Sequence, residues 1–123
     1  MGGMAVPRIS SDELKRRMDD AATAPLIVDV RLKYPYEHST VILPGALRSG
    51  PGTIDVALLS RDRDIVLYDS DPHEFVAELA AAELIAAGYR ACALQGGIGA
   101  WMAAKLPIDR KAAPQLMASP AKA

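Results

Sequence analysis

The chain has 123 residues and a mass of 13.1 kDa, which is the size of one domain. Half of its residues are hydrophobic and 24% are charged, as in an ordinary soluble globular domain. Fourteen Lys and Arg against fifteen Asp and Glu give a net charge of −1. This balance disfavours nucleic acid and acidic membranes as partners, because both require an excess of basic side chains.

The single cysteine, Cys92, excludes an internal disulfide framework and a thiolate-rich metal site. No unbroken apolar stretch approaches the roughly 20 residues that a membrane-spanning helix needs. The first residues, 1–6, lack the long apolar core of a signal peptide. We therefore expect a domain of the cytoplasm.

The first predicted elements are a helix and a buried strand. Ser10 and Glu13 have the spacing of a capping box, which predicts a helix over about 11–20. The run 26–30 is apolar and rich in β-branched residues, which is typical of a strand buried on both faces. The polar and aromatic stretch 31–43 is predicted to be a loop.

The middle of the chain is predicted to contain short elements and one long strand. Pro-Gly at 44–45 indicates a turn, and 46–47 is predicted to be a very short strand. The stretch 53–60 is compatible with a short helix capped by Thr53. The run 64–68 is the second buried strand.

The last third of the chain repeats the alternation of helix and strand. A polar loop over 69–73 leads into an alanine-rich helix, 74–87, which Gly88 ends. A third strand is predicted over 90–94, followed by a short helix over 98–104. Strands that alternate with helices predict an α/β domain with a parallel sheet and helices on both faces. We divide the chain into an N-terminal extension (1–8), one folded domain (9–110) and a tail (111–123).

The architecture alone indicates one candidate site. Open parallel sheets bind ligands where the carboxyl ends of strands lead into the N-termini of helices. The segment that leaves the strand 64–68 and enters the next helix is the best such place; it consists of Asp69, Ser70, Asp71, Pro72, His73 and Glu74. Helix N-termini of this kind favour an anion or a nucleophile with a lowered pKa.

Three interpretations of this loop remain open at this point. In the first, Asp69 or Asp71 only caps the helix and accepts hydrogen bonds from the loop amides. In the second, Asp69, Asp71, His73 and Glu74 form a metal or acid/base cluster, since two carboxylates spaced in this way can share a hard cation. The third, a modified nucleophile loop, depends on a family resemblance.

The order of several short motifs carries that resemblance. They are 27–31 (IVDVR), 36–37 (YE), 43–46 (LPGA), 65–68 (IVLY), 87–89 (AGY), 94–97 (LQGG), Trp101 and 106–107 (LP). Together, at these spacings, they resemble the rhodanese-like domain family over 9–108. The stretch before Pro44 departs from the family, which often has Gly-His-Ile where this chain has Val-Ile-Leu.

The resemblance implies a fold and an activity. The fold is a three-layer structure with a short, mostly parallel central sheet of about five strands. Active members are thiosulfate-type sulfurtransferases with a cysteine directly after the central strand, whose thiolate carries sulfane sulfur as a persulfide. The matching position here is Asp69. The loop also resembles a family variant reading Cys-Ser-Cys-Pro-Asn-Glu, so that Asp71 matches the second cysteine.

This departure changes the predicted chemistry, because a carboxylate cannot become a persulfide. We expect Asp69 to accept the loop N–H bonds itself, with a lowered pKa, and Asp71 to discourage thiosulfate from entering. The sequence therefore predicts a catalytically silent rhodanese-like domain, a pseudoenzyme with a binding or regulatory role. Its partner, a protein or a small molecule, and its oligomeric state are not predicted, and no cofactor or metal is assigned.

The remaining candidate residues are given structural roles. The resemblance places Asp29 and Arg31 in the family's Asp-x-Arg motif, and we expect Arg31 to pair with Glu37 or another nearby acid. Cys92 falls in a predicted buried strand, where a free cysteine is usually inert. The competing functions are sulfur transfer by family resemblance alone, a metal-dependent enzyme using the loop, and weak sulfur carriage by Cys92.

Overall fold

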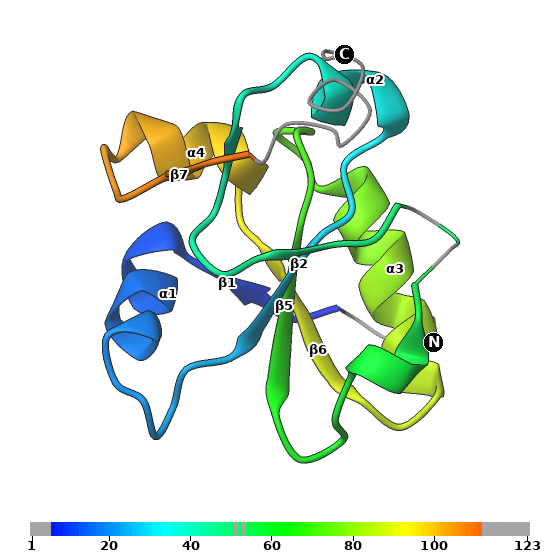
Figure 1. The fold of residues 1–123 in the computed structure, drawn as a ribbon. Coiled ribbons are helices and arrows are strands. Elements are labelled where there is room, and N and C mark those ends of the chain that lie inside the picture. The colour runs from blue at the N-terminus through cyan, green and yellow to red at the C-terminus, as the bar shows by residue number, and fades with distance from the viewer. Residues whose placement is uncertain (1–5, 51, 53, 112–123) are drawn as a thin grey trace, which may run out of the picture.

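A parallel sheet of five strands forms the centre of the molecule (Figure 1). The computed structural model describes residues 6–50, 52 and 54–111. The strands lie in the order β1-β6-β5-β2-β4. Their bounds are Arg8–Ile9 (β1), Leu26–Asp29 (β2), Leu47–Arg48 (β4), Asp64–Tyr68 (β5) and Arg90–Leu94 (β6). The predicted α/β class with a parallel sheet is therefore confirmed.

Three helices cover the two faces of this sheet. The helices α1 (Ser11–Met18) and α4 (Gly97–Ala103) lie on one face, and α3 (Phe75–Ala86) lies on the other (Figure 1). Alternate side chains of each strand point to opposite faces, so Ile65 packs on the α3 side and Val66 on the side of α1 and α4. The middle strands are therefore apolar at consecutive positions, which is why the sequence shows them as unbroken apolar runs.

A second, two-stranded antiparallel sheet was not predicted. The strand β3 (Val41–Ile42) pairs with β7 (Asp109–Arg110), and the helix α2 (Lys33–Glu37) also lies within the predicted loop 31–43. Both strands have only two residues, and each depends on a partner far away in the sequence. The helix α2 has no side-chain cap and contains Pro35, so it carries no local signal of its start.

The observed helix ends agree with the predictions to within a few residues. The Ser10 hydroxyl accepts the N–H of Glu13 at 3.1 Å, as the capping spacing predicts, and α1 ends at Met18. The short helix in 53–60 is a 3₁₀ turn, η1 (Val56–Leu58), whose cap is Asp55. Thr53, the predicted cap, lies outside the described residues.

The ends of the chain lie largely outside the described residues, which include neither 1–5 nor 112–123 of the predicted extension and tail. Several residues assigned to them contact the rest of the described chain. Arg8 begins β1, and Lys111 donates its backbone N–H to the Thr40 carbonyl at 2.8 Å. No helix in the described part of the chain is long and apolar enough to cross a membrane.

Candidate functional site

The carboxylate of Asp69 is enclosed by backbone amides. The residue directly follows β5 and is 1% exposed. Its Oδ1 accepts the N–H of Asp71 at 3.1 Å, and its Oδ2 accepts the N–H of Ala77 in the first turn of α3 at 2.8 Å. Both carboxylate oxygens therefore have partners from the protein's own main chain, at the place where the architecture predicts a ligand.

The other side of the loop packs against α4. The Asp69 carbonyl accepts the N–H of Ile98 at 2.9 Å. A Cβ on Gly97 would lie 2.5 Å from that carbonyl oxygen, and Gly97 has a φ of +63°. Only glycine combines this backbone conformation with so close an approach. The second glycine of the Gly-Gly pair after β6 thus lets α4 support the loop.

Burial raises the pKa of Asp69 above its usual value, and the nearby Asp71 carboxylate adds to this effect. The N–H groups of Ala77 and Asp71 act in the opposite direction. The sequence predicted a lowered pKa from the loop amides, and that prediction is wrong in sign. The amides are present as expected, but the loss of water around the carboxylate outweighs them.

The rest of the loop is a set of local turns. The Asp71 Oδ1 accepts the N–H of His73 at 2.8 Å, and the Asp71 carbonyl accepts the N–H of Glu74 at 3.0 Å. Ser70 and Pro72 are exposed. His73 is exposed as well, with its ring centroid 6.0 Å from that of Phe75.

Glu74 connects three separate parts of the chain. It is buried and adopts a left-handed backbone (φ 57°, ψ 33°) immediately before α3. Its Oε1 accepts from the Nε of Arg8 in β1 at 2.8 Å, and its Oε2 accepts the N–H of Gly96 at 2.7 Å. Glu74 therefore holds the loop to the edge strand and to the turn before α4. Sequence reasoning missed Arg8, since no local pattern links it to a loop so far along the chain.

The structure does not bring the four predicted cluster residues together around one point. Asp69 faces backbone amides, Asp71 caps a turn, His73 lies at the surface and Glu74 faces Arg8. Within the ranges 6–50, 52 and 54–111, no group of three or more His, Cys, Asp or Glu side chains could hold a metal ion.

A second buried carboxylate, Asp29, ends the neighbouring strand β2. Its Oδ2 accepts from the Nη2 of Arg31 at 2.7 Å and from the Tyr68 hydroxyl at 2.9 Å. Arg31 is 2% exposed and Asp29 is fully buried. The acid that pairs with Arg31 is thus Asp29, whereas Glu37 is exposed at the end of α2. The Tyr68 hydroxyl also accepts the N–H of Leu43 at 3.2 Å.

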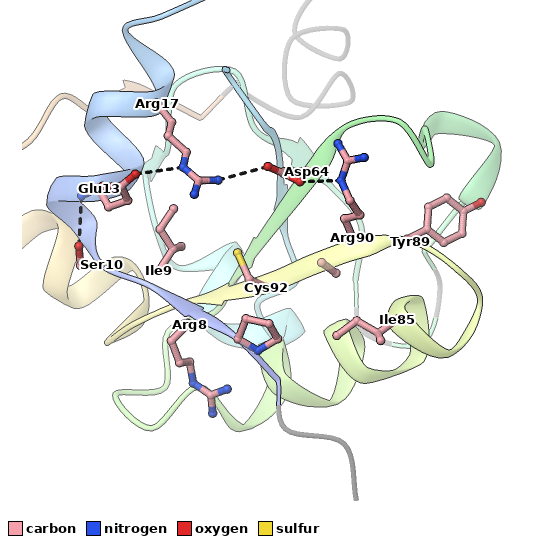
Figure 2. A pocket seen from close by; sticks show the side chains of 12 residues that line it. Arg8, Ile9, Ser10, Glu13, Arg17, Asp64, Ile85, Tyr89, Arg90 and Cys92 are labelled. Atoms are coloured by element: carbon pink, nitrogen blue, oxygen red, sulfur yellow. Dashed lines mark hydrogen bonds and ion pairs between the residues drawn. The ribbon is translucent and has the colours of Figure 1, made fainter. Parts of the chain in front are cut away.

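Cys92 lies elsewhere, in a cavity of about 740 Å³ between α1 and α3 (Figure 2). Burial raises the pKa of its thiol to about 11, and the Asp64 carboxylate adds to the increase while Arg17 opposes it. Cys92 pairs in register with Val66 in the middle of β5, whereas Asp69 lies beyond the end of that strand. The structure therefore does not place this thiol at the loop.

Comparisons with known proteins agree with this architecture. The family model described as rhodanese-like domain matches residues 10–104. A protein from Lactobacillus plantarum has a TM-score of 0.74 at 22% identity, with 85% of this chain and 88% of that chain covered. A rhodanese-like domain protein from Staphylococcus aureus has a TM-score of 0.66 at 24% identity, with 77% and 90% covered.

A thiosulfate sulfurtransferase from Pseudomonas aeruginosa has a TM-score of 0.68 at 21% identity; the match covers 85% of this chain but only 19% of that one. Identities this low show a shared fold and no more. No curated protein matches the chain. The family model, by contrast, covers most of the chain from the start of α1 to the end of α4. The chain therefore belongs to the rhodanese-like domain family.

Proposed function

We propose that this protein is a rhodanese-like domain without sulfurtransferase activity, with a binding or regulatory role in the cytoplasm. One observation carries the proposal. Asp69 stands directly after β5, where the resemblance to active members of the family places the sulfur-accepting cysteine. The single free cysteine of the chain is compatible with a reducing compartment.

The chemistry of the transfer explains why this one residue matters. In the first step a thiolate attacks the sulfane sulfur of thiosulfate, a sulfur–sulfur bond forms, and sulfite leaves with the electron pair of the broken bond. The enzyme then holds a persulfide, which an acceptor such as cyanide attacks. Asp69 has no sulfur atom to enter this sequence. Its two carboxylate oxygens also accept the backbone N–H groups of Asp71 and Ala77, which are then not free to bind an incoming anion.

Cys92 is a poor substitute for the missing nucleophile. Burial raises the pKa of its thiol to about 11, so the protonated thiol, which is not the nucleophile, predominates at neutral pH. Its position on β6 also separates it from the loop amides that would stabilise an incoming anion. Both features support a structural role for this residue.

The activity test is the formation of thiocyanate from thiosulfate and cyanide. We expect no turnover above the buffer background for the natural sequence or for Cys92→Ser. The variant Asp69→Cys is the matched gain-of-function test, and we expect it to gain the mass of one sulfur atom on incubation with thiosulfate. Turnover by the natural sequence that survives Cys92→Ser contradicts the proposal.

A second test addresses the enclosed carboxylate. In Asp69→Ala the N–H groups of Asp71 and Ala77 lose their acceptors, so we expect a destabilisation of about 1–3 kcal/mol. Formate should restore part of the lost melting temperature, because its carboxylate can occupy the vacated space. Chloride at equal ionic strength and the variant Asp71→Ala are the controls. Equal effects of formate and chloride on Asp69→Ala contradict a carboxylate-shaped site.

A further inference from the structure

The first two turns of α3 carry exposed apolar side chains. Leu79 is 70% exposed, and Phe75, four residues earlier on the same side of the helix, is 61% exposed. Leu32, the residue before α2, is 51% exposed. Large apolar side chains that gather at the surface of a soluble domain indicate a binding surface.

A groove lies between this part of α3 and the start of α2 (Figure 1). Its volume is about 250 Å³, and its lining consists of Leu32, Val76, Leu79 and Ala80 together with Gly52 and Glu83. A cavity of about 150 Å³ is enough for a benzene ring, so this groove has room for a large aliphatic side chain. It lies next to the candidate loop, since Val76 precedes Ala77, whose N–H is donated to Asp69.

The charges beside the groove favour an occupant without acidic side chains. Glu78 and Glu83 are the only charged residues of α3. Glu78 pairs with Arg8 at 3.3 Å, whereas Glu83 is exposed and lines the groove. Two copies of this face would bring like charges together, which disfavours a symmetric dimer here. The segment 112–123 of the same chain contains one lysine, Lys122, and no acid.

The last described residue, Lys111, lies close to this groove. It donates from its Nζ to the Tyr36 carbonyl in α2, and the Nζ lies 3.9 Å from the centre of the Tyr36 ring. Tyr36 donates its N–H to the Leu32 carbonyl at 3.0 Å, so the groove begins one helical turn away. A lysine side chain and one turn together span less than the roughly 17 Å that the extended residues 112–116 cover.

The segment has its bulky apolar side chains at this distance. Leu116 and Met117 are adjacent, and the other apolar residues of 112–123 are alanines and prolines. Methionine is unbranched and fills irregular apolar gaps well. Pro114 and Pro120 stand on either side of the pair and favour an extended backbone, which suits a chain that lies along a groove.

We propose that the groove between α2 and α3 binds the segment 112–123 of the same chain, with Leu116 and Met117 against Leu32 and Leu79. The two partners belong to one molecule, so the groove meets the segment at the high effective concentration that a short linker provides. Docked in this way, the segment covers the exposed apolar side chains and closes the groove to other proteins. This contact does not depend on the absence of sulfur transfer at Asp69.

The test uses the full chain with Cys92→Ser and a nitroxide spin label on Ser119→Cys. The label broadens the NMR signals of methyl groups that lie near it. We expect loss of the Leu79 methyl signals, whereas the Met18 methyl, in α1 on the opposite face of the sheet, keeps its signal. Adding Leu116→Ser and Met117→Ser should restore the Leu79 signals, because the segment then lacks its apolar side chains.

A matched pair of surface variants tests the groove itself. Leu79→Asp places a charge among the apolar side chains of the groove, so we expect it to release the segment and to restore the methyl signals of Val76. Met102→Asp makes the same change at an exposed residue of α4, where 47% of the residue is accessible. We expect it to leave the loss of the Val76 signals unchanged.

Three results would overturn the proposal. The first is retention of the Leu79 signals in the spin-labelled full chain. The second is their equal loss with and without the apolar pair at 116–117, which means that no specific contact holds the segment. The third is their loss in isotope-labelled chains without a spin label when spin-labelled chains are added, which means that the segment binds a second copy.

Discussion

Asp29 and Asp69 are two buried carboxylates at the carboxyl ends of adjacent strands, and they are held in different ways. Asp29 ends β2 and is paired with the Arg31 guanidinium and the Tyr68 hydroxyl. Asp69 follows β5 and is held by the backbone amides of Asp71 and Ala77. Their exposures, 0% and 1%, are nearly the same.

The comparison shows that burial alone does not define the role of an acid. Asp29 neutralises a buried cation, so its negative charge is required as long as Arg31 remains. Asp69 has no cation beside it among its described contacts, and burial raises its pKa. The first site therefore depends on charge. The Asp69 site depends instead on the backbone N–H groups that its carboxylate accepts.

The largest effect is expected from breaking the charged pair. Asp29→Ala leaves Arg31 buried without its partner, and loss of one member of a buried pair costs about 3–5 kcal/mol. The free energy of unfolding in urea measures the loss. Glu37→Ala is the matched control, because Glu37 is exposed, and we expect less than about 0.5 kcal/mol. Similar losses in both variants would show that Arg31 depends on both acids.

The next effect tests the backbone support of Asp69. Gly97→Ala places a Cβ 2.5 Å from the Asp69 carbonyl oxygen at a φ of +63°, and we expect a loss of about 1–3 kcal/mol. Gly99→Ala lies in the same helix with nothing within 4 Å of the new Cβ, so it should stabilise slightly. Thermal unfolding of both variants measures this difference in stability. Equal melting temperatures would mean that α4 shifts to accommodate the new Cβ at position 97 without loss of stability.

A smaller effect is expected from the hydroxyl that joins the Asp29 site to the turn after β3. Tyr68→Phe removes a donor to Asp29 and an acceptor for the Leu43 N–H, and we expect a loss of about 1–2 kcal/mol. Tyr89→Phe is the control, since its neighbouring cation, Arg61, contacts the ring. An unchanged unfolding midpoint for Tyr68→Phe would mean that water replaces the hydroxyl.

The smallest of these effects, a change of stability with pH, is expected at Asp69. A raised pKa in the folded state means that the natural protein loses stability as the pH rises through the ordinary aspartate value of about 4 to the higher folded value. Asp69→Asn cannot titrate, so this decrease should be absent; its side-chain NH2 cannot accept the second of the two backbone N–H groups, so we expect a loss of about 1–3 kcal/mol that does not vary with pH. Unfolding curves between pH 3 and 8 check this, with Asp71→Asn as control; an unchanged slope in Asp69→Asn contradicts the raised pKa.

Local sequence signals predicted the long elements well. The strands β2, β5 and β6 contain apolar runs of three or four residues, and α1 carries its own cap in Ser10. The two-residue strands β1, β3 and β7 have no such signal, because each exists only through pairing with a distant segment. Elements of this kind depend on the finished fold.

For the candidate site, too, local features could be predicted from the sequence and features that depend on the complete fold could not. The loop that starts at Asp69 follows from its place between β5 and α3. The sign of the pKa shift does not, since it depends on how much water the completed fold removes. The contact between Arg8 and Glu74 joins residues 66 positions apart, so no local sequence pattern predicts it.

The one tryptophan of the chain provides a natural optical reporter. Trp101 is fully buried in α4 and donates its Nε1–H to the Pro107 carbonyl at 2.7 Å. The same helix begins at Gly97, against the Asp69 carbonyl. Intrinsic fluorescence should consequently register any displacement of the loop as well as unfolding, with no dye attached to the molecule.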